Sequence, residues 1–142
     1  MSCYNSSVID APIEKVWNEI KDFHNMQWAK GVVEAVDVVG DISGSEVGAK
    51  RIINGAFHET LMTLNHKDYS FTYKITDGPG AVAKDAVSNY IGEVSLHRVT
   101  DTNQTYFLWT SSYESKDGTA VADLCNPVYQ AVLGAAKNNI KR

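Results

Sequence analysis

The dipeptide Asn54-Gly55 is the feature of this sequence that most restricts its fold. It lies between the segments 50–53 and 57–61, and an Asn-Gly pair in that position is the strongest short-range signal for a β-hairpin. Three further turn-forming runs follow, at 65–68, 77–80 and 101–104. The residues around these runs alternate between apolar and polar side chains. Six strands joined by hairpin turns must form an antiparallel sheet with one buried face.

A strand and two short helical segments precede most of these hairpins. Residues 2–9 predict a strand that ends before Pro12, a residue suited to the first turn of a helix. The apolar residues that follow repeat at helical spacing and predict a short helix whose buried face is made by Ile13, Val16, Trp17 and Ile20. Residues 23–28 predict a turn of helix against the core, and the valine-rich residues 32–39 predict the next strand.

One long helix closes the chain. Apolar residues recur at helical spacing from Val121, and Pro127 indicates either a kink or the true start of a helix of at least about 14 residues. No other element is long enough to cover the buried face of the sheet. The expected fold is α+β: a helix-grip fold, in which a seven-stranded curved antiparallel sheet wraps a long C-terminal helix, with two short helices after the first strand. We expect residues 1–142 to form a single domain.

Charge and cysteine usage exclude several classes of partner. The net charge is −4, and Lys and Arg form no run apart from a short C-terminal cluster, so no nucleic acid is expected as a partner. Residues 1–10 lack the features of a secretory leader, and no apolar stretch of about 18 residues predicts a membrane span. Cys3 and Cys125 are far apart in the sequence and are expected as reduced, buried thiols. These features predict a cytoplasmic protein.

Motifs for metal or cofactor chemistry are absent. The histidines have no HExxH spacing and are not accompanied by a cluster of carboxylates; they are His24, His58, His66 and His97. The sequence also lacks a GxSxG, a P-loop and a GxGxxG motif. We therefore expect no bound metal and no cofactor.

Several short motifs occur in the order and spacing of a known family. They are Ile9-Asp10-Ala11-Pro12 with Val16-Trp17, Asp22-Phe23, Gly48-Ala49-Lys50-Arg51, and the aromatic segments 69–75 and 106–113. Together they resemble the polyketide cyclase/dehydrase-like branch of the START-like (SRPBCC) superfamily, which has the fold of the birch pollen allergen. The resemblance covers nearly the whole chain and implies a helix-grip fold. That superfamily contains binding proteins, cyclases, dehydratases and chaperone-like subunits, so the fold leaves the function open.

Small residues on the last helix predict a cavity between that helix and the sheet. They are Ala131, Gly134, Ala135 and Ala136. We expect the cavity to bind a hydrophobic small molecule, such as a lipid, a polyketide or an isoprenoid-like compound. Its expected lining is Trp28, Phe57, Leu61, Phe71, Tyr73, Tyr90, Phe107, Trp109, Ser111, Tyr113, Val128 and Val132. Most of the aromatic residues are core by default, and residues 77–85 are either a gate over the cavity or an ordinary crossing loop.

Arg51 and Glu59 are the charged pair that would support an alternative, enzymatic function. The family resemblance would aim both toward the cavity, where they, or Arg51 with His58, would polarise a carbonyl and transfer a proton in a small cyclase, dehydratase or isomerase. A two-residue turn at Asn54-Gly55 pairs Arg51 with His58, whereas one extra turn residue pairs Arg51 with Glu59. A structural salt bridge is the other interpretation of the pair. We expect the protein to be a monomer or a homodimer.

Overall fold

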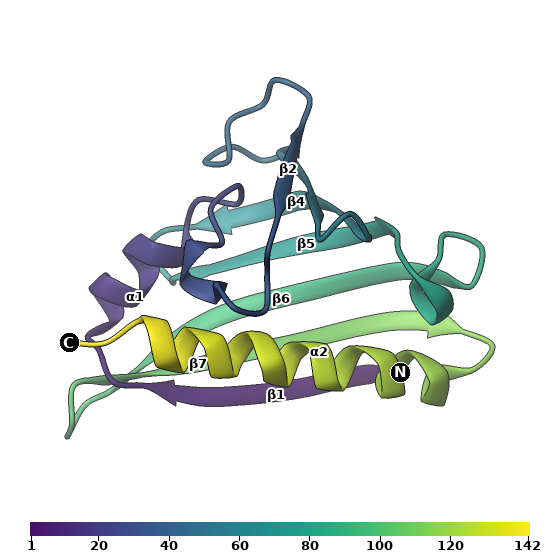
Figure 1. Cartoon of the computed structure of the whole chain (residues 1–142). Coiled ribbons are helices and arrows are strands. Elements are labelled where there is room, and N and C mark those ends of the chain that lie inside the picture. Colours follow the sequence, from purple (N-terminus) through teal and green to yellow (C-terminus); the bar gives the residue numbers. More distant parts are fainter.

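The computed structural model describes all residues 1–142, and its elements follow the expected order (Figure 1). β1 (Ser2–Ile9) leads into the helix α1 (Ile13–Ile20) and the 3-10 turn η1 (Gln27–Ala29). The central strands and a second 3-10 turn follow as β2 (Val36–Val39), β3 (Lys50–Ile53), β4 (Phe57–Asn65), β5 (Ser70–Asp77), η2 (Gly80–Val82), β6 (Val87–Val99) and β7 (Gln104–Ser115). The helix α2 (Gly118–Asn139) closes the chain.

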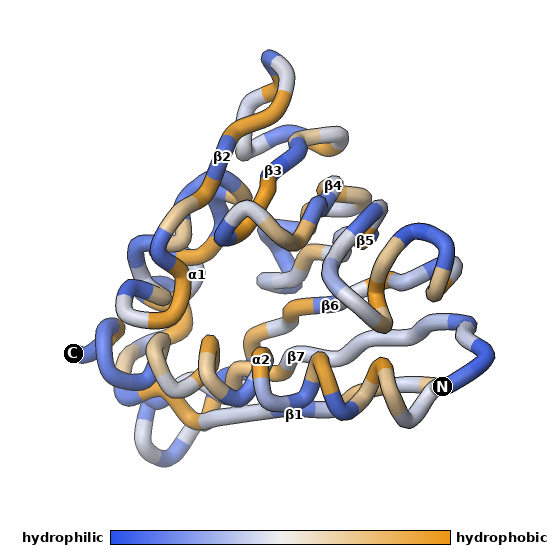
Figure 2. Tube along the Cα trace, turned by 45° about the vertical axis from the view of Figure 1, so that its right-hand side comes forward, coloured by the Kyte–Doolittle hydropathy of each residue, from blue (hydrophilic) through white to orange (hydrophobic).

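The seven strands form one antiparallel sheet in the order β1-β7-β6-β5-β4-β3-β2. All neighbours are consecutive in the chain except β1 and β7, which pair over the whole of β1. The sheet curves, and α2 runs along its concave side over β1 and β7 (Figures 1 and 2). Hydrophobic positions recur along α2 in Figure 2, as a helix packed on a sheet requires. The helix-grip fold is confirmed.

The closing helix has the expected minimum length, but it begins before Val121, and Pro127 lies inside it rather than at its start. It begins at Gly118 because the Asp117 side chain caps its first turn by accepting a hydrogen bond from the Ala120 N–H at 3.1 Å. The helix then continues through Pro127. Ala131 and Gly134 are exposed, so the expectation that they leave room for a cavity is wrong. No helix of the chain has the length and apolar character needed to cross a membrane.

The second strand is shorter than the predicted segment 32–39, because the side chain of Asn54 holds residues 32–35 in another conformation. Asn54 Oδ1 accepts hydrogen bonds from the backbone N–H groups of Glu34 (2.8 Å) and Ala35 (3.1 Å). Its Nδ2 donates to the carbonyl oxygen of Val32 at 3.1 Å. These backbone groups are therefore satisfied by a side chain rather than by a neighbouring strand.

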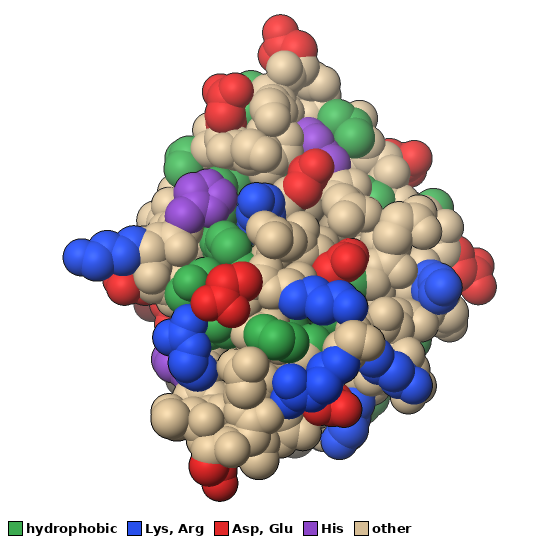
Figure 3. Space-filling view, turned by 90° about the vertical axis from the view of Figure 1, so that its left-hand side faces the viewer, with side chains coloured by type: hydrophobic (Ala, Val, Ile, Leu, Met, Phe, Trp, Pro, Cys, Tyr) green, Lys and Arg blue, Asp and Glu red, His purple; other side chains and the backbone are tan.

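The last residue fastens the C-terminus to the opposite end of the chain. The Arg142 backbone N–H donates to the Asp10 carbonyl at 2.9 Å, and Arg142 Nε donates to Asp10 Oδ1 at 2.8 Å. Arg98 pairs with Glu14 on α1 at 2.9 Å. Figure 3 shows this face of the molecule, where Lys and Arg side chains are interspersed with Asp and Glu.

Candidate functional site

The hairpin between β3 and β4 has a three-residue loop. Ile53 pairs with Phe57, and Arg51 therefore pairs with Glu59. Asn54 and Gly55 have φ values of 52° and 66°, the left-handed conformation that an Asn-Gly hairpin turn requires, and Ala56 is the extra residue. Of the two registers considered from the sequence, the one that brings Arg51 and Glu59 to the same inner face is present.

Arg51 and Glu59 form a buried ion pair. Arg51 is 3% exposed and Glu59 is 6% exposed. Arg51 Nη2 and Nε lie 2.7 Å and 2.9 Å from Glu59 Oε1, and Arg51 Nη1 donates to the Phe23 carbonyl at 2.9 Å. The guanidinium carbon lies 3.8 Å from the centre of the Phe23 ring. Nε and Nη1 of Arg51 thereby make hydrogen bonds, whereas Nη2 contacts Glu59 Oε1 without a hydrogen bond, and Glu59 Oε2 makes no hydrogen bond with the protein.

The electrostatic environment of Glu59 combines two opposing effects. Burial raises the pKa of the Glu59 carboxyl, and the charge and hydrogen bond of Arg51 oppose that shift. Glu59 Oε2 is therefore a buried acceptor whose affinity for a proton is above that of an exposed glutamate. It is the one group of the pair that could accept a hydrogen bond or a proton from a bound molecule.

A cavity of about 60 Å³ lies between the inner face of the sheet and α2. It is lined by Met26, Val32, Val33, Ile53, Asn54, Phe57, Glu59, Tyr73, Ile75, Trp109, Cys125, Val128, Tyr129 and Val132. Val32, Ile53, Phe57 and Val128 are only half-buried, so the mouth lies between the β3–β4 hairpin and α2. A volume of this size accommodates a few water molecules and is well below the roughly 300–1,000 Å³ of typical ligand pockets.

Three tyrosine hydroxyls and one indole form a hydrogen-bonded chain at the wall of the cavity. Trp109 Nε1 donates to the Tyr73 hydroxyl at 2.8 Å, and that hydroxyl lies 3.2 Å from the hydroxyl of Tyr129. Tyr129 also hydrogen-bonds the hydroxyl of Tyr90. Burial raises the pKa of all three tyrosines, so they act as neutral hydroxyls. Gly92, opposite Tyr73 in the sheet, makes room for the Tyr73 ring, because a Cβ there would lie 2.2 Å from Tyr73 Cζ.

The structure gathers some of the expected site residues around the cavity and places the others elsewhere. The expected residues that line it are Phe57, Glu59, Tyr73, Trp109, Val128 and Val132. The remaining expected ligand contacts are buried but do not line the cavity: Trp28, Leu61, Phe71, Tyr90, Phe107, Ser111 and Tyr113. His58 points to the outer face of the sheet with Lys50 and Thr60, beside Asp77, and not into the cavity.

Tyr129 is the main cavity residue that the sequence analysis missed. Cys125, Tyr129 and Val132 follow one another at i, i+4 and i+7, which is the spacing of one helix face and a signal that could have revealed them. Val32 and Val33 line the cavity without any such signal. Their position depends on the hydrogen bonds that the distant Asn54 makes to this segment.

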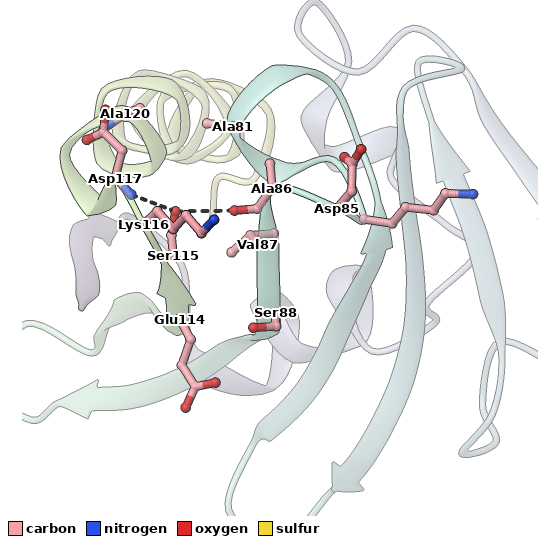
Figure 4. A pocket seen from close by; sticks show the side chains of 11 residues that line it. Ala81, Asp85, Ala86, Val87, Ser88, Glu114, Ser115, Lys116, Asp117 and Ala120 are labelled. Carbon is pink, nitrogen blue, oxygen red and sulfur yellow. Dashed lines mark hydrogen bonds between the residues drawn. The ribbon is translucent and has the colours of Figure 1, made fainter.

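A larger hollow of about 650 Å³ opens at the end of the sheet where α2 begins (Figure 4). Charged surface residues form much of its wall: Lys84, Asp85, Glu114, Lys116 and Asp117. Ser115 Oγ donates to the Ala86 carbonyl at 3.3 Å and accepts from the Asp117 N–H at 3.2 Å, as Figure 4 shows. These polar groups stabilise the turn and the helix start. We therefore take the smaller apolar cavity as the candidate site.

The loop 77–85 lines part of the larger hollow and is held in place by the side chain of Asp77. Asp77 Oδ1 accepts hydrogen bonds from the N–H groups of Gly78 (2.9 Å) and Lys84 (3.1 Å). Val82, in the middle of the loop, is fully buried. The loop thus covers one end of the core, and its role as a gate stays a prediction.

Solved structures with the same fold come from bacteria and from a plant. A protein from Nitrosospira multiformis is 33% identical over 99% of this chain and 97% of that chain, with a TM-score of 0.95. XoxI from Bacillus cereus is 19% identical over 98% and 94% of the two chains, with a TM-score of 0.79. Norcoclaurine synthase from Thalictrum flavum, solved in complex with dopamine and hydroxybenzaldehyde, is 13% identical over 97% and 84%, with a TM-score of 0.74.

Sequence comparison identifies the family of this chain. No protein with a curated function matches it. The family described as polyketide cyclase / dehydrase and lipid transport matches residues 2–141, which is almost the whole sequence. The likeness to norcoclaurine synthase shows that the two proteins share this fold. The chain belongs to the polyketide cyclase / dehydrase and lipid transport family.

Proposed function

We propose that this protein binds an apolar small molecule, such as a lipid, a polyketide or an isoprenoid, between the inner face of the sheet and α2. The composition of the cavity carries the proposal, because twelve of its fourteen lining residues are hydrophobic. Apolar walls with a few converging polar groups are the usual composition of small-molecule sites. Glu59, Tyr73 and Tyr129 supply those polar groups here.

Binding requires the mouth of the cavity to widen, since the closed volume of about 60 Å³ is too small for such a ligand. Val32, Ile53 and Phe57 form one side of the mouth, and Val128 on α2 forms the other. No hydrogen bond joins the β3–β4 hairpin to α2. At the C-terminal end of α2, Asn139 donates hydrogen bonds to the carbonyls of Trp28 and Lys30, which lie in the segment before β2. Separating the two sides therefore breaks no hydrogen bond and exposes mainly apolar surface, which the ligand would cover again.

The experiment that tests this proposal is native mass spectrometry of the purified protein, followed by titration with the neutral fluorescent probe N-phenyl-1-naphthylamine. We expect a retained or added apolar molecule at one per chain. Val132→Trp should abolish binding because the indole fills the cavity, whereas Ala131→Trp, on the exposed side of α2, should not. Equal loss of binding in both variants, or no binding by the wild type, would contradict the proposal.

One observation favours a second candidate function, a small cyclase, dehydratase or isomerase. Glu59 carries an unpaired oxygen at the cavity wall and has a raised pKa, as a general acid or base requires. Arg51 would hold Glu59 in place rather than touch the substrate, because Arg51 does not line the cavity. In an assay on the retained molecule, Glu59→Gln should abolish turnover, while His58→Gln, on the outer face, should leave it unchanged. Full turnover by Glu59→Gln would rule out this function.

We also propose a cytoplasmic location and a monomeric or homodimeric state. Cys3 and Cys125 are both buried free thiols, which suits a reducing compartment. Sedimentation velocity would distinguish the monomer from the homodimer, and a larger assembly would contradict this part of the proposal.

A further inference from the structure

We infer that the ligand of this cavity is an uncharged molecule that presents a hydroxyl or carbonyl oxygen, and that a carboxylate of the same shape is rejected. This inference rests on the proposed binding function and adds the chemical class of the ligand. It follows from the lack of a cationic side chain in the cavity lining and from the hydrogen-bonding groups at the cavity wall.

No cationic side chain lines the cavity. Glu59 is its only charged lining residue, and that carboxylate is already neutralised by Arg51, whose Nη2 lies 2.7 Å from Glu59 Oε1. Arg51 itself does not line the cavity, and its Nη2, which makes no hydrogen bond, lies against Glu59 Oε1. An entering carboxylate would lose its water shell and meet a like charge without gaining a partner. An entering ammonium ion would add a second positive charge to an ion pair that is already balanced.

The hydroxyl chain provides neutral hydrogen bonds instead. Tyr73, Tyr129 and Tyr90 carry three hydroxyl protons, and only two contacts link the three oxygens to one another. One proton is therefore left for an acceptor outside the chain: Ser111 or Cys125 when the proton lies on Tyr90, and a bound molecule when it lies on Tyr73 or Tyr129. Tyr73 and Tyr129 both line the cavity, so a ligand oxygen placed there can accept that proton. A ketone can accept it, and an alcohol can also donate a hydrogen bond in return.

Ser111 provides a second, independent observation. Its side chain is 5% exposed, and its Oγ is buried without any hydrogen-bond partner. Ser111 pairs with Gly92 in the sheet and lies between Trp109 and Tyr113 on the inner face, next to the hydroxyl chain. Ser111 does not line the cavity, but its hydroxyl beside Tyr90 adds another neutral polar group, and no charge, to this end of the interior.

Four probes with the same eight-carbon chain test the inference on the wild-type protein at pH 7.5. They are 2-octanone, 1-octanol, octanoate and octylammonium, each measured by displacement of N-phenyl-1-naphthylamine. We expect the ketone and the alcohol to bind and both ions to bind roughly 100-fold more weakly or worse, the scale of an uncompensated buried charge. Octanoate or octylammonium binding as tightly as 1-octanol would overturn the inference but not the proposed function. Failure of every probe, including the dye, would overturn both.

Two variants identify the groups responsible. Glu59→Gln leaves the Arg51 charge without its partner, so octanoate should gain affinity by about 10-fold or more and should raise the Tm of the variant more than 1-octanol does. Tyr129→Phe should weaken 2-octanone by about 5-fold, the scale of one neutral hydrogen bond, whereas Tyr106→Phe on the outer face should not. An unchanged preference in both Glu59→Gln and Tyr129→Phe would refute the assignment.

Discussion

Substitution of Gly92 by alanine should destabilise the protein strongly. An added Cβ would lie 2.2 Å from Tyr73 Cζ and 2.4 Å from both Cε1 and Oη of the same ring. These separations are far below van der Waals contact, so the ring must move. The Tyr73 hydroxyl would then lose the hydrogen bond from Trp109 at 2.8 Å and its contact with Tyr129 at 3.2 Å.

The expected loss of stability is about 3 kcal/mol. Overpacking in a core costs roughly 1–3 kcal/mol, and each lost neutral hydrogen bond costs about 1 kcal/mol. The smaller backbone entropy of alanine offsets about 0.5 kcal/mol of that sum. For a chain of 142 residues, a change of about 3 kcal/mol corresponds to a fall in Tm of about 10 °C. Urea unfolding followed by circular dichroism measures the first quantity, and a thermal melt measures the second.

Gly134→Ala is the matched control, because a Cβ at that exposed helical position meets nothing within 4 Å. It should stabilise the protein by about 0.5–1 kcal/mol, since alanine is the better helix former. Tyr73→Leu removes the clashing ring atoms, so Gly92→Ala should cost much less in that background. A Gly92→Ala variant as stable as the wild type, or one with the same cost in both backgrounds, would refute this account of the Tyr73 contact.

Three further predictions concern the ion pair, the helix cap and the C-terminus. Arg51→Met should cost about 3–5 kcal/mol in urea unfolding, and adding Glu59→Leu should recover most of that loss, because two buried apolar groups replace one unpaired charge. Asp117→Ala should cost about 1 kcal/mol by the same measurement. The hydrogen bond from Arg142 holds the pKa of Asp10 below its ordinary 3.8, so this contact persists above that pH and is lost as the pH falls through the lower value. The protection factor of the Arg142 amide, its exchange rate relative to that of the unfolded chain at the same pH, should fall below about pH 4 and stay constant between pH 5 and 7.

Much of the fold could be predicted from local patterns. The alternation along β5 to β7 and the turn at Asn54-Gly55 depend on neighbouring residues alone, and such signals survive in any tertiary context. The start of α2 could not be found in this way, because residues 118–125 are small and weakly periodic and the helix begins there through the Asp117 cap. The start of the predicted strand 32–39 is wrong for a different reason. The Asn54 side chain, twenty residues from Glu34 in the sequence, accepts the hydrogen bond that the Glu34 N–H would make to a neighbouring strand.

The site was harder to predict than the fold. Alternation indicated which aromatic residues face inward, but it could not show that Phe107 and Trp28 fill space while Phe57 and Trp109 border a cavity. That distinction depends on how side chains from distant elements pack. The pairing of Arg51 with Glu59 depended on one turn residue, Ala56, which shifts every cross-strand pair by one position.

Asn54 makes this hairpin turn difficult to exchange for another. In most proteins an Asn-Gly turn can be replaced by an Asp-Gly turn with little effect, because both tolerate positive φ. Here Asn54→Asp would set a carboxylate oxygen against the Val32 carbonyl that now accepts from Nδ2. The hairpin would still form, but residues 32–35 would lose part of the hydrogen bonding that holds them. Val32 and Val33, which form one wall of the cavity, would then be displaced. A substitution that is conservative for the strand pairing would therefore be disruptive for ligand binding.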